Sequence, residues 1–384
     1  MKASPGSADD KVTSLYVHVP FCAHKCEYCA FYSKLPSGEL VNRYVDALIR
    51  EMELLADQLA PKTVFFGGGT PSLLSISQWR KLLAAMERLD LLGAEEWTVE
   101  CNPATVSADK AKLLREFGVN RISMGVQSLD VGLLERLGRI HSREQVSRSY
   151  EIMRDAGFEN INLDLMFGIP TQTTEIWQAT LDEILSLGTQ HISCYEVIYE
   201  EDTPLYAQLK AGEFDVDEDL IEEMYGMLVD TTRAAGFHQY EVANFANSPE
   251  TECRHNTVYW RGGNYFGLGP SASEHRSGTR SRNWSNTQLY CEQLEQGKRA
   301  IESVEELSPL ASAGETAAFG LRMNRGWKFE DFREITGYDL EKEWSAEIDR
   351  LVSSDMAVCD GDGFHLTPHG LRFADHAAGE FLRV

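Results

Sequence analysis

The chain has 384 residues, 43% hydrophobic and 25% charged, a length that predicts two domains because single cores stop growing near ~250–300 residues. A formal net charge of −24, with Lys and Arg scattered along the chain, argues against a nucleic-acid partner because phosphate backbones would be repelled. No apolar run reaches the ~18 residues that a membrane span requires, so no transmembrane segment is expected.

Short apolar runs alternate with amphipathic segments throughout the first half of the chain. The runs rich in β-branched residues give six predicted strands: Leu15–Val19, Thr63–Phe66, Trp97–Glu100, Arg121–Met124, Asn160–Met166 and His191–Val197. Between the first two, apolar residues from Val41 to Leu59 recur every three or four positions, which predicts a helix with one apolar face. Strands that alternate with helices indicate a parallel sheet. The predicted fold class is α/β, a partial (β/α)6 barrel with a small α+β C-terminal domain.

The predicted domain boundaries follow changes in this rhythm. We expect a flexible tail without a secretory signal over 1–13, the barrel and its following elements over 14–245, a linker region over 246–302, and a winged-helix-like domain over 303–384. In the last of these, two short strands, Met356–Val358 and Gly363–Leu366, flank an Asp-Gly-Asp-Gly turn. This pattern predicts a hairpin beside helices.

Three cysteines stand together directly after the first predicted strand, in the run Cys22-Ala-His-Lys-Cys26-Glu-Tyr-Cys29. A structural zinc site would need a fourth ligand, which His18 or His24 could supply, so zinc stays open as a minor alternative. Three thiolates on a four-iron cube leave one iron free for a small chelating molecule. We therefore expect Cys22, Cys26 and Cys29 to hold a [4Fe–4S] cluster. The other five cysteines are dispersed, unlike those of a secreted disulfide scaffold, and indicate the cytoplasm.

A glycine run, Gly67-Gly68-Gly69-Thr70-Pro71, follows the second predicted strand. Alone it is explained equally well as a tight turn, but beside the cysteines it offers a bound cofactor main-chain groups that no Cβ shields. Polar residues also stand at or after the later strand ends, at Glu100, Gln127, Arg139 and Asp164. Such positions face the ligand in βα barrels, although each residue alone could be a helix cap or a rim salt bridge.

Together, the cysteine motif, the glycine run and the partial barrel resemble the radical S-adenosylmethionine (SAM) superfamily. The resemblance implies that SAM chelates the open iron and is cleaved by one electron to a 5′-deoxyadenosyl radical. The order of the motifs is similar to that of the coproporphyrinogen-oxidase-like branch. In that branch the matching positions that contact SAM are Tyr16, Gly68, Gly69, Thr70, Glu100, Gln127, Arg139 and Asp164. Carboxylates suit the ribose hydroxyls and the ammonium of SAM, and a guanidinium suits its carboxylate.

Two departures distinguish this sequence from the true oxygen-independent coproporphyrinogen III oxidases. Those oxidases carry a further cysteine where this chain has Phe31, and a longer N-terminal extension, whereas 21 residues precede Cys22 here. The run from Cys253 to Trp260 instead matches the His-Asn-x-x-Tyr motif of the heme chaperone HemW family. This resemblance implies a protein that binds heme at His255 and Tyr259 and delivers it to heme-requiring apoproteins, and it leaves a homodimer open. Coproporphyrinogen oxidation and a radical SAM methyltransferase or cyclopropanase activity are the alternatives, so enzymatic turnover stays undecided.

The residue chemistry around this motif suits heme. The imidazole of His255 could bind iron, the neighbouring aromatic residues could contact the macrocycle, and Arg254 and Arg261 could meet its propionates. Cys253 is a less favoured thiolate ligand. The competing interpretation is that His255 satisfies buried backbone groups of an irregular loop, since aromatic clusters are usually core.

Overall fold

The first half of the chain winds strands and helices into an open barrel in the computed structural model, which describes residues 11–103 and 105–383. The six barrel strands are β1 (Val12–Val19), β2 (Leu59–Gly68), β3 (Glu96–Cys101), β4 (Arg121–Gln127), β5 (Asn160–Phe167) and β6 (His191–Glu196). They are parallel and pair in chain order. All six predicted strands are confirmed, and only Val197 lies beyond an observed strand end.

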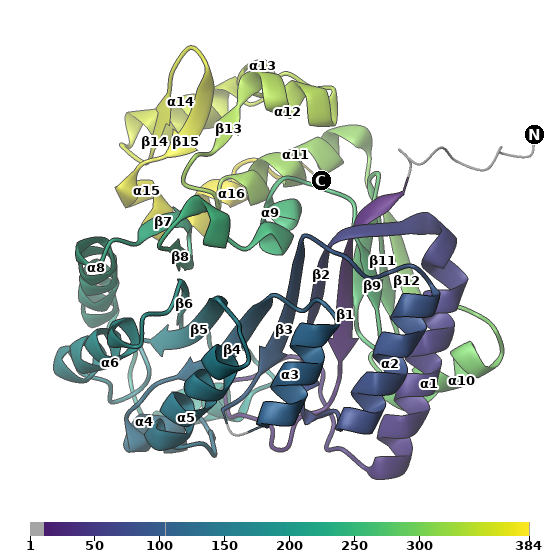
Figure 1. Cartoon of the computed structure of the whole chain (residues 1–384). Helices are drawn as coiled ribbons and strands as arrows, with labels where there is room; N and C mark the ends of the chain where they lie inside the picture. The colour runs from purple at the N-terminus through teal and green to yellow at the C-terminus, as the bar shows by residue number, and fades with distance from the viewer. Residues whose placement is uncertain (1–10, 104, 384) are drawn as a thin grey trace, which may run out of the picture.

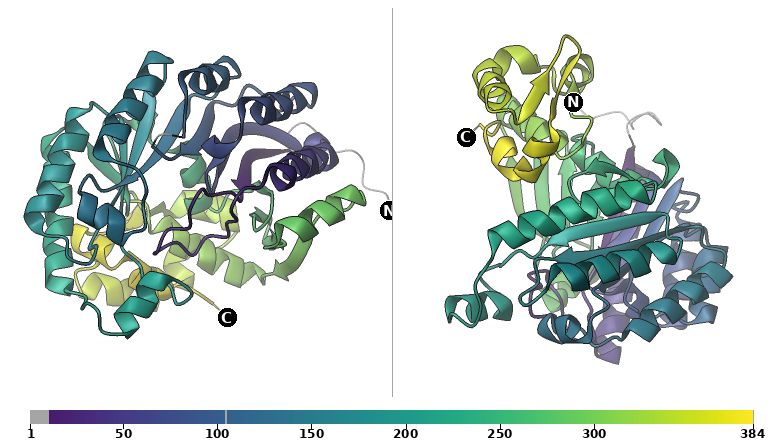
Figure 2. Two further views of the ribbon diagram at one scale, coloured as in Figure 1. Left: turned by 90° about the horizontal axis from the view of Figure 1, so that it is seen from below. Right: turned by 90° about the vertical axis from the view of Figure 1, so that its left-hand side faces the viewer.

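Helices cover the outer face of this sheet (Figures 1 and 2). They are α1 (Gly38–Leu55), α2 (Ile76–Arg88), α3 (Ala108–Glu116), α5 (Arg143–Asp155), α6 (Thr174–Ser186) and α8 (Glu218–Ala234), with short 3-10 turns η2 (Ala56–Gln58) and η3 (Pro71–Leu73). The short helices α4 (Val131–Arg136) and α7 (Pro204–Lys210) pack in a separate apolar cluster at the carboxyl ends of the strands. Ser75 and Ser142 begin α2 and α5 with capping boxes, in which side chains satisfy the free N–H groups of the first turn. The tail predicted over 1–13 falls mainly outside the described residues, and Val12 already belongs to β1.

The two faces of the barrel sheet differ sharply in polarity. Along each strand, alternate residues such as Leu15, Val17, Val64 and Phe66 join the apolar core against the helices. Because successive strand side chains point to opposite faces, the residues between them face the barrel interior. These inward residues are Ser14, Tyr16, His18, Thr63, Phe65, Gly67, Glu96, Thr98, Glu100, Arg121, Ser123, Gly125, Asn160, Asn162, Asp164, His191, Ser193 and Tyr195. Most of them are polar, so the interior is built to hold a ligand rather than to pack.

Three short strands extend the sheet at both edges. The antiparallel β7 (His238–Glu241) and β8 (Asn244–Ala246) follow β6, while β9 (Phe266–Leu268) pairs parallel with β1. The segment 246–302, predicted as a linker, is folded: it contains η4 (Pro249–Thr251), α9 (Arg254–Trp260), β9, β10 (Ser273–Arg276), β11 (Thr279–Asn283), α10 (Thr287–Glu295) and the start of β12 (Ile301–Glu306). The last three strands form a separate antiparallel sheet. Phe266 and Leu268 are fully buried, which explains why this segment packs rather than links.

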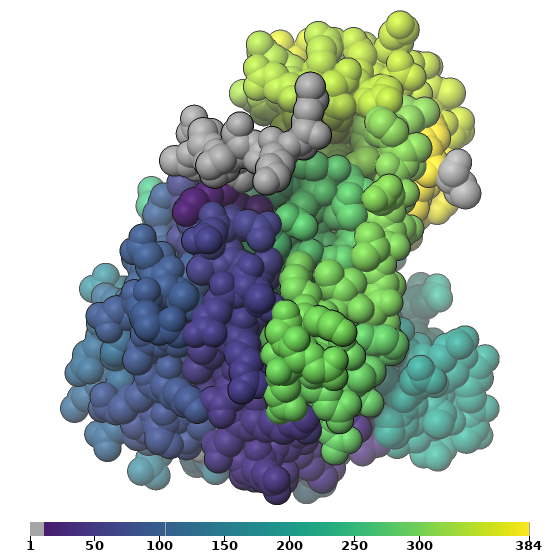
Figure 3. Space-filling view, turned by 90° about the vertical axis from the view of Figure 1, so that its right-hand side faces the viewer, coloured from purple at the N-terminus to yellow at the C-terminus, as the bar shows by residue number. Residues whose placement is uncertain are grey.

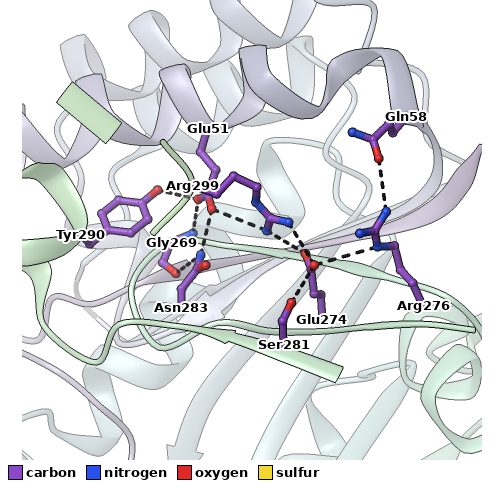
Figure 4. Close-up of polar contacts among 9 residues, drawn as sticks. All are labelled: Glu51, Gln58, Gly269, Glu274, Arg276, Ser281, Asn283, Tyr290 and Arg299. Carbon is purple, nitrogen blue, oxygen red and sulfur yellow. Dashed lines mark hydrogen bonds and ion pairs between the residues drawn. The ribbon is translucent and has the colours of Figure 1, made fainter. Parts of the chain in front are cut away.

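A buried polar network fastens this segment to α1 (Figure 4). Glu51 of α1 accepts hydrogen bonds from the Tyr290 hydroxyl at 2.7 Å, the Gly269 N–H at 2.9 Å and the Asn283 amide at 2.8 Å. Arg299 forms a two-pronged ion pair with Glu274, at 3.0 and 2.7 Å. Figure 3 shows the two segments packed side by side on this face of the molecule. The network closes the seam between the first and last strands of the barrel region.

The C-terminal domain has its own core, centred on Trp327, Phe332, Trp344 and Phe364. It consists of α11 (Pro309–Gly320), β13 (Trp327–Lys328), α12 (Phe329–Thr336), α13 (Leu340–Glu343), α14 (Ser345–Ser353), β14 (Ala357–Cys359), β15 (Gly363–Leu366), α15 (Pro368–Arg372) and α16 (Ala374–Gly379). Strands β14 and β15 form the predicted hairpin. The domain lies at the end of the barrel where the strands begin (Figure 1). Within the described part of the chain, no helix is both long and apolar enough to cross a bilayer.

Candidate site inside the barrel

The loop after β1 carries the three motif cysteines across the end of the barrel where the strands finish (Figure 2, left). Cys22, Cys26 and Cys29 are free thiols and half-buried. Among the described residues, no three His, Cys, Asp or Glu side chains converge closely enough to bind a metal ion. The assignment of the three cysteines as cluster ligands stays a prediction.

Two residues predicted to contact SAM approach these sulfur atoms. The Thr70 hydroxyl donates to Sγ of Cys22 at 3.8 Å, and Nη1 of Arg139 donates to Sγ of Cys26 at 3.7 Å. Asn102 joins them, since its amide nitrogen donates to Thr70 at 2.9 Å and its oxygen accepts from Arg139 at 2.8 Å. Asn102 was not predicted, although its place directly after β3 gave the same signal as Glu100. These residues border a small cleft, which is also lined by Ala23, His24, Leu73, Pro103, Thr105, Gly138, Ile140 and His141.

The packing of the barrel gives a second reason for the glycine run, besides the predicted access of a cofactor to the main chain. A Cβ on Gly68 would lie 2.3 Å from Nδ1 of His18, and a Cβ on Gly69 would lie 2.7 Å from the Val19 carbonyl oxygen. Gly68 also has a φ of 101°, a value that strongly favours glycine. The missing side chains therefore let β2 pack against β1 and the cysteine loop. The Gly68 N–H donates to the Glu100 carboxylate at 3.1 Å.

His18 connects the strand to the cysteine loop. Its Nδ1 lies 3.1 Å from the Tyr16 hydroxyl, and its Nε2 lies 3.0 Å from the Tyr32 carbonyl oxygen. Burial lowers the pKa of His18 to about 4. A neutral imidazole therefore fixes the end of the loop relative to Tyr16, which was predicted to contact SAM.

The two inward-facing carboxyl groups Glu100 and Asp164 have raised pKa values. Burial, reinforced by the charge of Asp164, raises the pKa of Glu100 to about 8, and burial raises the pKa of Asp164 to about 6. Asn162 donates to Asp164 at 2.6 Å. Gln127, at the end of β4, has a φ of 66°, a conformation that non-glycine residues adopt rarely and that costs energy. Perturbed carboxyl groups and a strained backbone at one end of a barrel are typical of a ligand site.

The predicted heme residues lie at the opposite end of the interior. Helix α9 begins on the Glu96 carboxylate, which accepts from the N–H groups of Arg254 at 2.9 Å and His255 at 2.8 Å. This contact holds the N-terminus of α9 over the first residues of the strands. A carboxylate is favourable at this position because the N-terminus of a helix carries partial positive charge. The His-Asn-x-x-Tyr motif thus forms part of the barrel floor.

His255 is enclosed by its neighbours and is only 1% exposed. Its Nδ1 lies 2.9 Å from the Thr63 hydroxyl and its Nε2 lies 2.7 Å from the Tyr259 hydroxyl, while its ring stacks on Phe65. Burial, with the charge of Arg121, lowers its pKa to about 3. Both ring nitrogens already have partners, so iron could bind His255 only after a partner moves. The sequence could not show this, because the partners come from other elements.

Comparison with known proteins agrees with this architecture. The family model described as "Radical SAM superfamily" matches residues 16–184, and the "HemN C-terminal domain" matches 307–373. The protein named heme chaperone HemW from Lactococcus lactis is 35% identical to this chain, and the alignment covers 97% of this chain and 98% of the relative. The chain belongs to the HemW family. The Bacillus subtilis HemW is also 35% identical, over 96% of this chain and 99% of its own.

A solved structure shows the same fold. Coproporphyrinogen III oxidase (HemN) from Escherichia coli aligns with a TM-score of 0.84 over 97% of this HemW-family chain and 90% of its own, at 21% identity. At that identity the likeness concerns the fold alone. The radical SAM barrel with a C-terminal domain that the sequence predicted is therefore confirmed.

Proposed function

We propose that this protein binds heme and delivers it to heme-requiring apoproteins in the cytoplasm, and that it carries a [4Fe–4S] cluster and SAM. The observation that carries the proposal is the identity of 35% with a protein named heme chaperone HemW along almost the whole of both chains. The polar interior supports it, because a ligand in the barrel would meet hydrogen-bonding groups on every strand. The free state of all eight cysteines supports a reducing compartment.

Cys22, Cys26 and Cys29 would hold the cluster, and the cluster with SAM would supply one-electron chemistry when bound. Around them the chain's own residues prepare the site. Arg139 and Thr70 point hydrogen-bond donors toward the cysteine sulfur atoms, the kind of contact that tunes the reduction potential of a cysteine-bound cluster. The remaining predicted SAM contacts are Tyr16, Gly68, Gly69, Glu100, Gln127 and Asp164. With pKa values of about 8 and about 6, Glu100 is mostly protonated and Asp164 mostly ionised near neutrality. The pair can therefore donate hydrogen bonds to a polar ligand and also accept them.

His255 and Tyr259 would meet heme from the floor of the barrel. We propose that Nε2 of His255 binds the iron and that the Tyr259 hydroxyl, now 2.7 Å away, gives up this position. The low pKa of His255, caused mainly by burial, keeps the imidazole neutral and so able to bind a metal. The stacked ring of Phe65 holds the imidazole plane in place.

A Soret titration with hemin tests this proposal. Wild type should show a saturable shift, His255→Ala a weaker one, and Tyr259→Phe an equal or tighter one because the competing hydroxyl is absent. His369→Ala, on the exposed surface of α15, is the control and should match wild type. Cys26→Ser should also bind heme, since the floor lies at the far end of the strands from the cysteine loop.

The proposal fails if wild type shows no saturable shift. Anaerobic incubation with SAM, dithionite and coproporphyrinogen separates the main alternative. Formation of protoporphyrinogen would identify an oxidase rather than a chaperone.

A further inference from the structure

Three polar side chains form a row across the barrel floor. Thr98 of β3 lies in register with Arg121 of β4, and Arg121 with Asn160 of β5. Residues in register on neighbouring parallel strands point to the same face. Within the described part of the chain, each has a buried polar atom without a hydrogen-bond partner: Oγ1 of Thr98, Nε of Arg121 and Oδ1 of Asn160. Buried polar atoms are satisfied in nearly all native proteins, so this row lacks a partner that belongs there.

Arg121 is the charged residue of the row, so it needs a hydrogen-bond partner most. It is 2% exposed, and among the described residues its guanidinium takes part in none of the hydrogen bonds or ion pairs. The carboxylates whose charges raise the pKa of Arg121 are Glu96 and Asp164. Both already accept hydrogen bonds from other groups. Glu96 caps α9, and Asp164 accepts from Asn162 and Ser123. Their charges help to raise the pKa of Arg121 against the effect of burial, but neither carboxylate is hydrogen-bonded to its guanidinium. The buried N–H groups of Arg121 are therefore free to bind an anion that enters the barrel.

We infer that Arg121, flanked by Thr98 and Asn160, is the binding site for a carboxylate of the barrel's ligand. A guanidinium presents two parallel N–H groups that match the two oxygens of a carboxylate. The Thr98 hydroxyl can donate to the same group. This assignment rests on the proposed heme function, under which the carboxylate is a propionate of the porphyrin.

The site proposed at Arg121 is distinct from the site predicted for the carboxylate of SAM, because the two lie at different levels of the barrel. Arg121 is the first residue of β4 and Gln127 the last, and six steps of ~3.3 Å place their backbones about 20 Å apart. The cysteine loop and the predicted SAM contacts Gly68, Gly69, Thr70, Gln127 and Arg139 lie toward the Gln127 end, whereas His255 lies at the Arg121 end. Tyr16 is at the level of the row, because it pairs with Phe65 and Phe65 with Thr98. Arg121 is near enough to help lower the pKa of His255, after the larger effect of burial. One porphyrin could therefore reach both residues.

Solvent reaches the inner face of β6 near its carboxyl end. Tyr195 faces inward there, and the charges of Asp164 and Glu100 act on it across the barrel. Its exposed fraction is 42%, so a ligand could enter from this side of the barrel.

Two ligands and one substitution test the inference. Hemin and hemin dimethyl ester have the same iron and macrocycle, but the two propionates are charged carboxylates in hemin and neutral methyl esters in the other compound. Wild type should bind hemin roughly ten- to a hundredfold more tightly than the ester, the usual effect of one charge-assisted hydrogen-bonded pair. Arg121→Gln should reduce this ratio to nearly one. Arg148→Gln removes an exposed arginine of α5 and should preserve the ratio.

Two further measurements keep the outcome decisive. If Arg121→Gln does not fold, Thr98→Val, which keeps the shape of the side chain, should still reduce the ratio several-fold. Affinity for SAM on the cluster-reconstituted protein should be unchanged in both variants. A preserved hemin-to-ester ratio in Arg121→Gln, or a loss of SAM affinity with the ratio intact, overturns the inference while leaving heme binding standing. A wild type that binds neither porphyrin overturns the inference and the proposed function together.

Discussion

Replacing Glu51 by Gln should cost the protein about 2–4 kcal/mol of its free energy of unfolding. Glu51 is 0% exposed, and its Oε2 accepts from Tyr290 and Gly269 while its Oε1 accepts from Asn283. A glutamine can turn its oxygen toward the first two donors, but its amide then faces the Asn283 amide donor to donor. The loss is one charge-assisted hydrogen bond, worth ~1.5–3 kcal/mol, together with the cost of an unsatisfied buried donor.

The matched control is Glu53→Gln, two residues along the same helix. Glu53 is exposed and pairs with Arg88 at 2.5 Å on the surface, a kind of pair worth only ~0–1 kcal/mol. Urea unfolding followed by tryptophan fluorescence should give a clearly lower midpoint for Glu51→Gln and nearly the wild-type midpoint for Glu53→Gln. Equal midpoints for the two variants would show that the seam network does not stabilise the barrel.

Three further predictions concern the interior. Replacing Cys26, or either of the other two motif cysteines, by Ser should abolish both the iron content and the cluster absorption band of the anaerobically reconstituted protein. Cys291→Ser should keep both. A full cluster band in Cys26→Ser would exclude the ligand assignment. Asp164→Ala should weaken SAM binding roughly ten- to a hundredfold in calorimetry without changing iron content, and an unchanged isotherm would return Asp164 to a structural role. The pKa of Glu100 is about 8 in the native protein and ~4.5 when unfolded, so the native state holds the extra proton between these values and loses stability as the pH rises through them. Glu100→Gln should remove about 2–3 kcal/mol of that loss between pH 5.5 and 7.5 in the metal-free protein. Parallel pH profiles for the two proteins would contradict this prediction.

The barrel could be predicted from the sequence because its signal is local. Each strand from β1 to β6 is a short β-branched run followed by a turn and an amphipathic helix, and residues within about ten positions suffice to recognise it. The cysteine motif and the glycine run are equally local. Their places at the strand ends follow from the parallel order of the strands.

The elements that close the barrel could not be predicted in the same way. Strand β9 spans only Phe266–Leu268 and gains its stability by pairing with β1, far away in the chain. The state of His255 likewise depends on Thr63, 192 positions away. Arg121 was recognised only as the start of a strand, because nothing in its local pattern shows that its side chain lacks a partner.

The pairing of β1 with β9 also sets an order of events during synthesis. Leu15 leaves the ribosome roughly 250 residues before its partner Phe266, and at ~5–20 residues per second this interval lasts roughly 12–50 s. During that time the outer edge of β1 has unpaired backbone groups, which can join other strands. Tyr32, at the end of the cysteine loop, is synthesised about as long before its partner Thr287. In the folded chain the Tyr32 hydroxyl accepts a hydrogen bond from the Thr287 backbone N–H at 2.8 Å. For tens of seconds, therefore, only the nearby contact with His18 can hold the end of the cysteine loop in the nascent chain, and the hydrogen bond that joins it to α10 forms last.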